Sequence, residues 1–270
     1  MSAPHILVEE IGPILQVTFN RPEKLNALSF ELIEGLWKAV ATYAEREDLR
    51  CFLIRSTGRY FSAGADLLGG QASPRSGGTA AVREWYRTKM GGGMQPLYDE
   101  IENLEKPFVV AHHATCVGGG LELSLSCDFR LAAQSAKYSF PEAKLGAIPA
   151  SNGVSRLTRL VGPHWAKWSI LANQLIDADR ALSIGLVHDV YPDEIFEAKV
   201  LEFCRGLAEI PPEMAAMAKL TIDLAADVTA ERARKIERLG QSILQVGAEA
   251  AGLTAQVQAR LRTPSDRRPG

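Results

Sequence analysis

Two glutamates and the glycine-rich run before the first of them are the residues of this sequence best suited to chemistry. The run Gly118-Gly119-Gly120 leads through one leucine into Glu122, and Glu142 follows 20 positions later. Glycine has no Cβ, so a substrate can press directly against bare backbone there. A carboxylate among leucines is costly to bury unless it has a partner or a task. Two carboxylates served by exposed backbone N–H groups suit proton transfer next to a carbonyl that gains negative charge.

The same residues also fit interpretations without a function. A single glutamate lies most often on a solvated surface, and a glycine triplet is usually a flexible turn. Leu121, Leu123 and Leu125 alternate with polar residues, which by itself indicates a half-buried strand with its polar side toward water. The choice between a site and a surface strand therefore depends on the rest of the chain.

The composition is that of an ordinary globular protein. The chain has 270 residues, of which 46% are hydrophobic and 23% charged, with a formal net charge of −2. This length allows one large domain or two small ones. A nucleic-acid or membrane surface would require a basic excess or patch, so we expect neither as a partner. A signal peptide and a long apolar run are both missing, which predicts a cytoplasmic location.

The cysteines and histidines do not have the spacing of a metal site. Four widely separated cysteines lie in apolar neighbourhoods: Cys51, Cys116, Cys127 and Cys204. Without a Cys-x-x-Cys pair, buried reduced thiols are favoured over disulfides or zinc ligands. His112 and His113 are adjacent, so they would point to opposite faces of a strand. We therefore expect no metal site.

Hydrophobic patterns predict an α/β core followed by helices. The expected strands are residues 6–10, 14–19, 51–54, 108–111, 129–133 and 187–191. The expected helices are residues 30–45, with Ser29 as N-cap, and then 194–209, 212–225 and 230–250. Between two strands, residues 68–93 are rich in Gly, Ser and Pro. We expect such a segment to be mobile, and it could cover a site as a lid.

Several motifs in a fixed order resemble the enoyl-CoA hydratase/isomerase (crotonase) family across essentially the whole chain. They are residues 20–29 (NRPEKLNALS), 58–67 (GRYFSAGADL), 117–122 (VGGGLE), 127–133 (CDFRLAA) and 141–149 (PEAKLGAIP). The resemblance implies a spiral of ββα units with a helical C-terminal extension. It also implies that a helix begins at Gly119, which overrides the strand-like alternation of the leucines.

The same resemblance implies a division of the chain. Residues 1–195 would form the core with the acyl-CoA site. Residues 196–260 would form a helical region that covers the core and mediates oligomerisation, and residues 261–270 a flexible tail. The expected assembly is a homo-oligomer, either a trimer or a dimer of trimers.

Roles in a reversible hydration also follow from the resemblance. Water would add to a trans-2-enoyl-CoA to give a 3-hydroxyacyl-CoA. Glu122 would take a proton from the water that attacks C3, and Glu142 would deliver a proton to C2. The N–H groups of Ala65 and Gly119 would hold the thioester oxygen. No cofactor is required, because coenzyme A is part of the substrate. The expected substrate-binding residues are Lys24, Ala63, Asp66, Leu67, Leu68 and Gly118.

Some assignments keep an alternative. Asp66 also fits a structural cap, Asp128 fits structural hydrogen bonds better than catalysis, and His113 fits a packed core histidine better than a pocket residue. The chain has Ala150-Ser151-Asn152 where many hydratases have a glycine-rich turn, and His112-His113-Ala114 where Val-Asn-Gly is common. Both departures affect the expected water site and acyl pocket.

Rival activities remain within and outside the family. A double-bond isomerase needs only one carboxylate, and hydrolases of this fold use other residues. A non-catalytic relative would be expected to lose at least one of the glutamates or oxyanion positions. Because Glu122, Glu142 and both oxyanion positions are retained, the hydratase interpretation is favoured.

Overall fold

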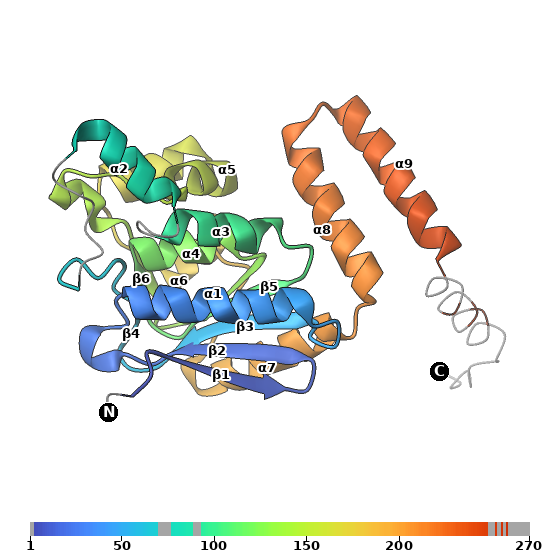
Figure 1. The fold of residues 1–270 in the computed structure, drawn as a ribbon, viewed down its shortest axis with the longest axis horizontal. Helices are drawn as coiled ribbons and strands as arrows, with labels where there is room; N and C mark the ends of the chain where they lie inside the picture. Colours follow the sequence, from blue (N-terminus) through green and yellow to red (C-terminus); the bar gives the residue numbers. More distant parts are fainter. Residues whose placement is uncertain are drawn as a thin grey trace, which may run out of the picture. The chain divides into compact units, whose positions relative to one another are not determined.

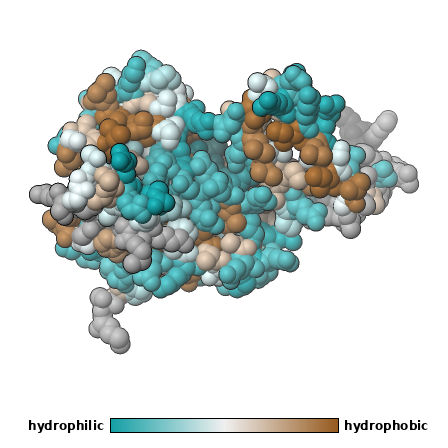
Figure 2. Space-filling view, turned by 45° about the horizontal axis from the view of Figure 1, so that its top comes forward, coloured by the Kyte–Doolittle hydropathy of each residue, from teal (hydrophilic) through white to brown (hydrophobic). Residues whose placement is uncertain are grey.

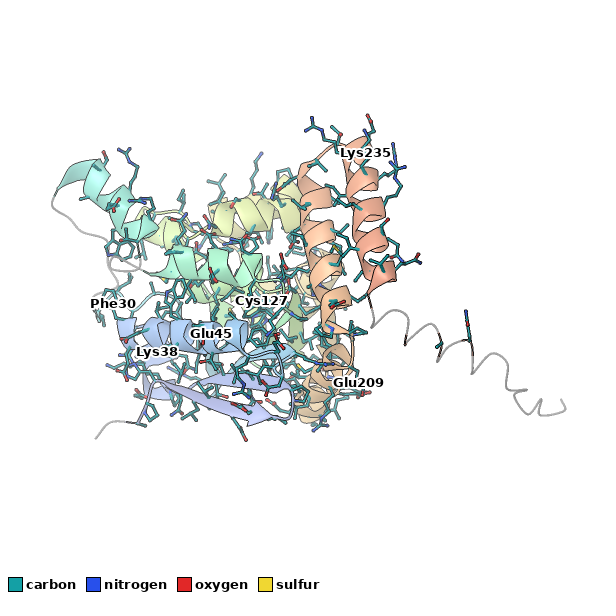
Figure 3. All side chains as sticks on the ribbon, turned by 45° about the vertical axis from the view of Figure 1, so that its right-hand side comes forward. Phe30, Lys38, Glu45, Cys127, Glu209 and Lys235 are labelled. Carbon is teal, nitrogen blue, oxygen red and sulfur yellow. The ribbon has the colours of Figure 1, made fainter. Side chains whose placement is uncertain are left out.

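The structure is a computed structural model that describes residues 3–69, 77–88 and 93–247, and beyond these Gly252, Ala255 and Gln258. The chain divides into two compact units, Met1–Glu209 and Ile210–Gly270. Glu209, at the end of the first unit, is labelled in Figure 3. None of the helices in the described part of the chain is long and apolar enough to cross a membrane.

Two sheets form the framework of the first unit (Figure 1). The larger has the order β1 (Ile6–Ile11), β2 (Ile14–Phe19), β3 (Cys51–Ser56), β5 (Phe108–His112), β7 (Phe129–Ala133) and β10 (Asp189–Tyr191). The smaller has the order β4 (Tyr60–Ser62), β6 (Thr115–Val117), β8 (Lys137–Ser139) and β9 (Ile176–Asp177). β3, β5 and β7 lie in the larger sheet, and the strand that follows each of them lies in the smaller. Each successive pair of strands thus adds one strand to each sheet, which is the ββα spiral that was expected.

Helices complete each turn of the spiral. Those of the first unit are α1 (Phe30–Glu45), α2 (Gly78–Arg87), α3 (Met94–Asn103), α4 (Gly119–Ser126), α5 (Gly153–Ala166), α6 (Ala178–Ser183) and α7 (Asp193–Ala208). Three shorter helical segments are η1 (Pro22–Lys24), η2 (Pro141–Leu145) and η3 (Lys167–Leu171). The second unit contains α8 (Pro212–Asp227) and α9 (Ala230–Val246).

The middle strands of the larger sheet are buried on both faces, whereas the edge strand β1 is largely exposed. The strands of this sheet from β2 to β10 are parallel, and parallel strands are usually covered on both sides. Along β3, Phe52 and Ile54 join the cluster that contains α1, whereas Cys51 and Leu53 join the cluster that contains α7. The two helices therefore cover opposite faces of the sheet, and α1 is seen lying across it in Figure 1.

Helix α1 forms as the sequence predicts. The Ser29 hydroxyl accepts the Leu32 N–H at 3.2 Å, so the helix begins with a side-chain cap. Phe30 and Glu45 mark its two ends in Figure 3, with Lys38 between them. Lys38 is exposed and pairs with Glu34 one turn earlier. An apolar face toward the core and a charged face toward water account for its position.

One expectation is confirmed and two need correction. The helix that the family resemblance predicts at Gly119 is α4, and the alternating leucines belong to it. The whole helix, including Ser124 and Ser126, is buried. A helix buried on all sides can show the alternation of a half-buried strand. Within residues 68–93, where no regular element was expected, the structure contains α2; residues 70–76 and 89–92 lie outside the described residues. The strand expected at 187–191 is shorter, since β10 begins at Asp189.

Over residues 210–247, the second unit consists of two helices joined by a two-residue connection. Hydrophobic side chains gather over this pair in Figure 2. The exposed ones include Ile222, Leu224, Leu239, Ile243 and Val246. Helix α7 packs on the sheet of the first unit, although the expected division at residue 195 placed it in the helical region. The tail expected at 261–270 lies outside the described residues.

Candidate active site

Two backbone N–H groups are brought together at the end of the smaller sheet. β4 and β6 are parallel neighbours, so the loop that carries Ala65 and the helix start at Gly119 leave the sheet side by side. A Cβ built on Gly119 would lie 3.4 Å from the Ala65 nitrogen, and one built on Gly64 would lie 3.1 Å from the Gly119 nitrogen. The structure thus places the two predicted oxyanion donors close together.

Both donors are fixed by neighbouring contacts. Leu28 donates its N–H to the Gly64 carbonyl at 2.8 Å and accepts the Asp66 N–H at 3.2 Å, which holds the loop around Ala65. The Tyr98 hydroxyl of α3 donates to the Gly119 carbonyl at 2.8 Å. Among the described residues, no protein atom accepts the Ala65 or Gly119 N–H. Gly119 is also the first residue of α4, where the positive end of the helix dipole adds to the attraction for an anion.

Glu122 lies one turn into α4 and is 4% exposed. Its Oε1 accepts the Ser151 N–H at 2.8 Å and the Gly153 N–H at 3.3 Å. Burial, together with the neighbouring Glu142, raises the pKa of Glu122 from 4.5 to about 8, and the two N–H donors oppose this rise. The carboxyl group therefore holds a proton at a higher pH than an exposed glutamate would.

Glu142 reaches the same place from the next turn of the spiral. β8 pairs with β6 in parallel, and η2, which carries Glu142, follows β8. A Cβ built on Gly118 would lie 2.9 Å from Glu142 Oε1, so the carboxyl group lies against bare backbone. Gly118 has a φ of +54°, which favours glycine. Burial raises the pKa of Glu142, and its Oε2 is buried without a hydrogen-bond partner among the described residues.

A third ionisable group is close to both carboxyls. Burial raises the pKa of Tyr86, and the charges of Glu122 and Glu142 raise it further. Tyr86 lies on α2, within the segment that the sequence predicts to cover a site. Nothing in the local sequence identifies it, because the two glutamates are far away along the chain.

The other predicted substrate-binding residues lie near the Ala65 loop or on η1. Ala63 donates its N–H to the Leu25 carbonyl at 2.9 Å. The backbone of Gly118 lies against the carboxyl group of Glu142. Leu67 and Leu68 are 51% and 99% exposed, and Lys24 is exposed on η1. Their contact with a substrate stays a prediction.

Asp66 has structural partners. Its carboxylate pairs with the Arg21 guanidinium and accepts the Gly69 N–H at 2.8 Å. Although burial acts to raise the pKa of Asp66, these hydrogen bonds outweigh it and lower the pKa. Asp128 Oδ2 accepts the Phe108 N–H at 2.7 Å. Both residues make the structural hydrogen bonds that the sequence offered as an alternative.

The two histidines differ from expectation. His112, not His113, is the core histidine: it is fully buried between the rings of Phe61 and Tyr138. Burial first, and then the charge of Arg130, lowers the pKa of His112 to about 3. His113 is only half-buried, and its Nε2 lies 2.6 Å from the Gly58 carbonyl oxygen.

The four cysteines are buried and are not joined in disulfides, as predicted. Within residues 3–69, 77–88 and 93–247, no group of three or more His, Cys, Asp or Glu side chains is arranged to hold a metal ion. The arrangement that remains is one of two adjacent N–H donors without a protein acceptor among the described residues, beside a buried carboxyl of Glu122 and a half-buried one of Glu142.

Similarity to known proteins extends over nearly the whole chain. A family model for enoyl-CoA hydratase/isomerase matches residues 9–258. A probable enoyl-CoA hydratase of Rhizobium meliloti (strain 1021) is 33% identical over 96% of this chain and 97% of its own length. A crotonyl-CoA hydratase of Syntrophomonas wolfei is 34% identical over 72% of each chain. The carnitinyl-CoA dehydratase of Salmonella typhi is 33% identical over 73% of this chain and 70% of its own.

The fold agrees with the sequence match. The crystal structure of an enoyl-CoA hydratase from Bacillus anthracis has a TM-score of 0.85 and 29% identity, and the match covers 97% of this chain and 98% of the other. An enoyl-CoA hydratase from Thermoplasma volcanium gives a TM-score of 0.83 at 28% identity, with 94% and 97% covered. On the extent of these matches, the chain belongs to the enoyl-CoA hydratase/isomerase family.

Proposed function

We propose that this protein is an enoyl-CoA hydratase, which adds water reversibly to a trans-2-enoyl-CoA to give the 3-hydroxyacyl-CoA. The observation that carries the proposal is the convergence of two carboxyls with raised pKa, Glu122 buried and Glu142 half-buried, beside two N–H groups without a protein acceptor in the described residues. Relatives named as hydratases at 33% and 34% identity support the same reaction.

The reaction places negative charge on the thioester oxygen, and the site must stabilise this charge. When water adds at C3, electrons move onto this oxygen, and the N–H groups of Ala65 and Gly119 stabilise the enolate that forms. Donors held in place before the reaction need no reorganisation, and removing one typically costs about 10²–10³ in rate. The loop contacts of Leu28 and the Tyr98 hydroxyl provide this preorganisation.

The reaction also requires two proton transfers, and the paired glutamates are suited to make them. The reactive form of the pair is the one in which Glu122 is ionised and Glu142 protonated; because the pKa of Glu122 is raised to about 8, ionisation of Glu122 increases as the pH rises toward that value. Glu122, stabilised as a carboxylate by two N–H donors on Oε1, takes the proton of the attacking water on Oε2. Glu142, which has no such donor on its buried Oε2 among the described residues, gives its proton to C2. Reversal of both transfers dehydrates the product.

The proposal also includes how the acyl-CoA binds and how the protein assembles. Lys24 and the loop from Ala63 to Leu68 would contact the coenzyme A part of the substrate, and no separate cofactor takes part. The exposed apolar side chains of α8 and α9 fit a homo-oligomer, a trimer or a dimer of trimers, in which this surface is covered.

Isotope incorporation tests the reaction. Trans-2-enoyl-CoAs of graded length and branching would be incubated with the protein in ¹⁸O-labelled water and analysed by mass spectrometry. A hydratase puts the label on the acyl chain of an intact thioester, whereas an isomerase moves the double bond without label. A hydrolase puts the label on a freed carboxylate and releases a thiol. Release of coenzyme A as the only reaction across the panel would overturn the proposal.

A further inference from the structure

Asn152 occupies a special place in the turn that contacts Glu122. It lies between Ser151 and Gly153, the two residues whose N–H groups reach Glu122 Oε1. Its backbone is left-handed, with φ 68° and ψ 10°, a conformation that glycine adopts freely and asparagine tolerates better than most residues. The backbone angles of Asn152 therefore help to set how these two N–H groups lie relative to each other.

Two side chains of α3 hold the amide group of Asn152. Gln95 Nε2 donates to Asn152 Oδ1 at 2.8 Å, and Asn152 Nδ2 donates to Asp99 Oδ1. Gln95 and Asp99 are four positions apart on α3, so they lie on the same side of the helix. The two ends of one planar amide are thus fixed by two successive turns of a helix that also packs into the core through Leu97 and Tyr98.

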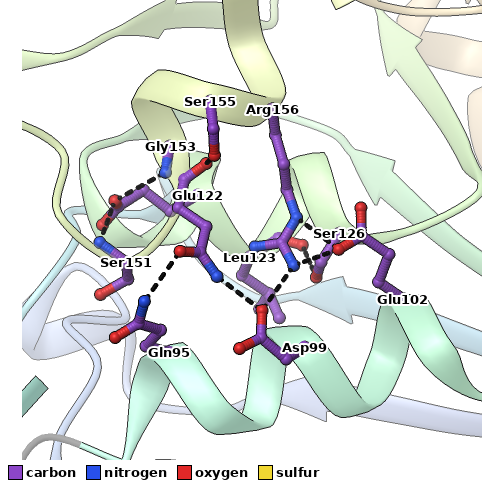
Figure 4. A network of polar contacts seen from close by, with 11 residues as sticks. Gln95, Asp99, Glu102, Glu122, Leu123, Ser126, Ser151, Gly153, Ser155 and Arg156 are labelled. Carbon is purple, nitrogen blue, oxygen red and sulfur yellow. Dashed lines mark hydrogen bonds and ion pairs between the residues drawn. The ribbon is translucent and has the colours of Figure 1, made fainter. Parts of the chain in front are cut away.

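A buried arginine completes the arrangement. Arg156, on α5, donates to Asp99 at 3.0 Å and to Glu102 at 3.1 Å, and is 8% exposed. Its single positive charge pairs with both Asp99 and Glu102 of α3, so the Asp99 carboxylate that accepts the Asn152 amide also has a cationic partner. Figure 4 shows α3, the turn and α5 linked through these side chains.

We propose that Asn152 is a positioning residue for Glu122: its amide, held by Gln95 and Asp99, fixes the turn whose N–H groups orient the Glu122 carboxylate. The inference rests on the proposed role of Glu122 in hydration. The hydrogen bonds of Gln95 and Asp99 to the Asn152 amide, which we call the amide clamp, lie at the turn where many hydratases have glycines. Loss of the clamp loosens the N–H donors, and a carboxylate with weaker donors is both less well aligned and easier to protonate.

The test is Asn152→Gly, because glycine keeps the left-handed backbone unstrained while it removes the amide. We expect kcat to fall by about 10-fold or more, since small misplacements of reacting groups are costly, while KM changes by less than about threefold. The limb of the pH profile of kcat that reports ionisation of Glu122 should move to higher pH, because weaker donors disfavour its ionised form. Gln95→Met removes one of the two hydrogen bonds to the Asn152 amide. It should change kcat and the pH profile in the same direction, but less.

Ser155→Ala is the matched control. The Ser155 hydroxyl is exposed and donates to the Asn152 carbonyl at 3.0 Å, so this change alters the same turn without touching the amide clamp. It should keep kcat and both pH limbs. Melting temperature and circular dichroism would show whether each variant is folded. If Asn152→Gly kept wild-type kcat and pH limbs, or lost stability and activity with unmoved limbs, the positioning role would be wrong.

A second measurement does not depend on hydration. Infrared or ¹³C NMR titration of the buried carboxyls reports the protonation of the Glu122–Glu142 pair directly, in the wild type and in Asn152→Gly. A higher titration midpoint in the variant supports the clamp even if no enoyl-CoA is hydrated, in which case only the proposed reaction fails. An unchanged midpoint overturns the clamp whatever the activity.

Discussion

Replacing Glu122 with glutamine should remove activity and at the same time stabilise the fold. Because the folded-state pKa of about 8 lies above the ordinary 4.5, the folded chain binds a proton that the unfolded chain has released. Stability therefore falls as the pH rises through this window. At 1.36 kcal/mol per pKa unit, the ionisable carboxyl costs about 3 kcal/mol at pH 7. Glutamine has no such charge, and its oxygen can still accept both N–H groups.

Denaturant unfolding of the wild type and Glu122→Gln at pH 5 and at pH 7 measures this cost. The stability advantage of the variant should grow by about 2 kcal/mol between the two pH values. Hydration should fall by roughly 10²–10⁴, as for loss of a positioned acid or base. A stability difference that stays the same at both pH values would refute the reasoning, because it would show that Glu122 titrates in the same way in the folded and the unfolded chain.

Three other changes test the site and its support. Gly119→Pro removes one N–H at a helix position that tolerates proline, so kcat should fall by about 10²–10³ with the circular dichroism spectrum retained; full activity would exclude this donor. Gly118→Ala brings a Cβ within 2.9 Å of Glu142 Oε1, so turnover should drop by at least about 10-fold, measured beside urea unfolding. Because burial lowers the pKa of His112 to about 3, the wild type should lose roughly 3 kcal/mol of stability as the pH falls from 6.5 to 4; acid titration of His112→Gln should show a flatter dependence.

Elements with a strong local pattern were predictable from the sequence. The helical spacing of apolar residues after Ser29 predicts α1, and the structure confirms both its N-cap and its ends. The apolar run at Phe129 predicts β7. The helix α4 was predictable only through the family resemblance, because its burial on all sides makes the polar positions uninformative. Hydrophobic periodicity identifies a helix only when one side of the helix is exposed, and α4 has no exposed side.

The site was predictable in its main residues but not in its supports. Glu122, Glu142 and the N–H groups of Ala65 and Gly119 lie close together as expected, and their catalytic roles stay a prediction. Tyr98 and Asp99 are ordinary members of an amphipathic helix in sequence. Their contacts with residues 21 and 53 positions away depend on how α3 packs, which no local pattern encodes. The half-buried position of His113, next to a fully buried His112, was missed for the same reason.

Helix α3 holds two parts of the site at once. Through Tyr98 it holds the carbonyl of Gly119, and through Gln95 and Asp99 it holds the turn that orients Glu122. A change that displaces this helix is therefore expected to disturb both contacts together, the one at the Gly119 carbonyl and the one at the turn beside Glu122. A single substitution on α3 can thus reach two parts of the site that lie far apart in the sequence.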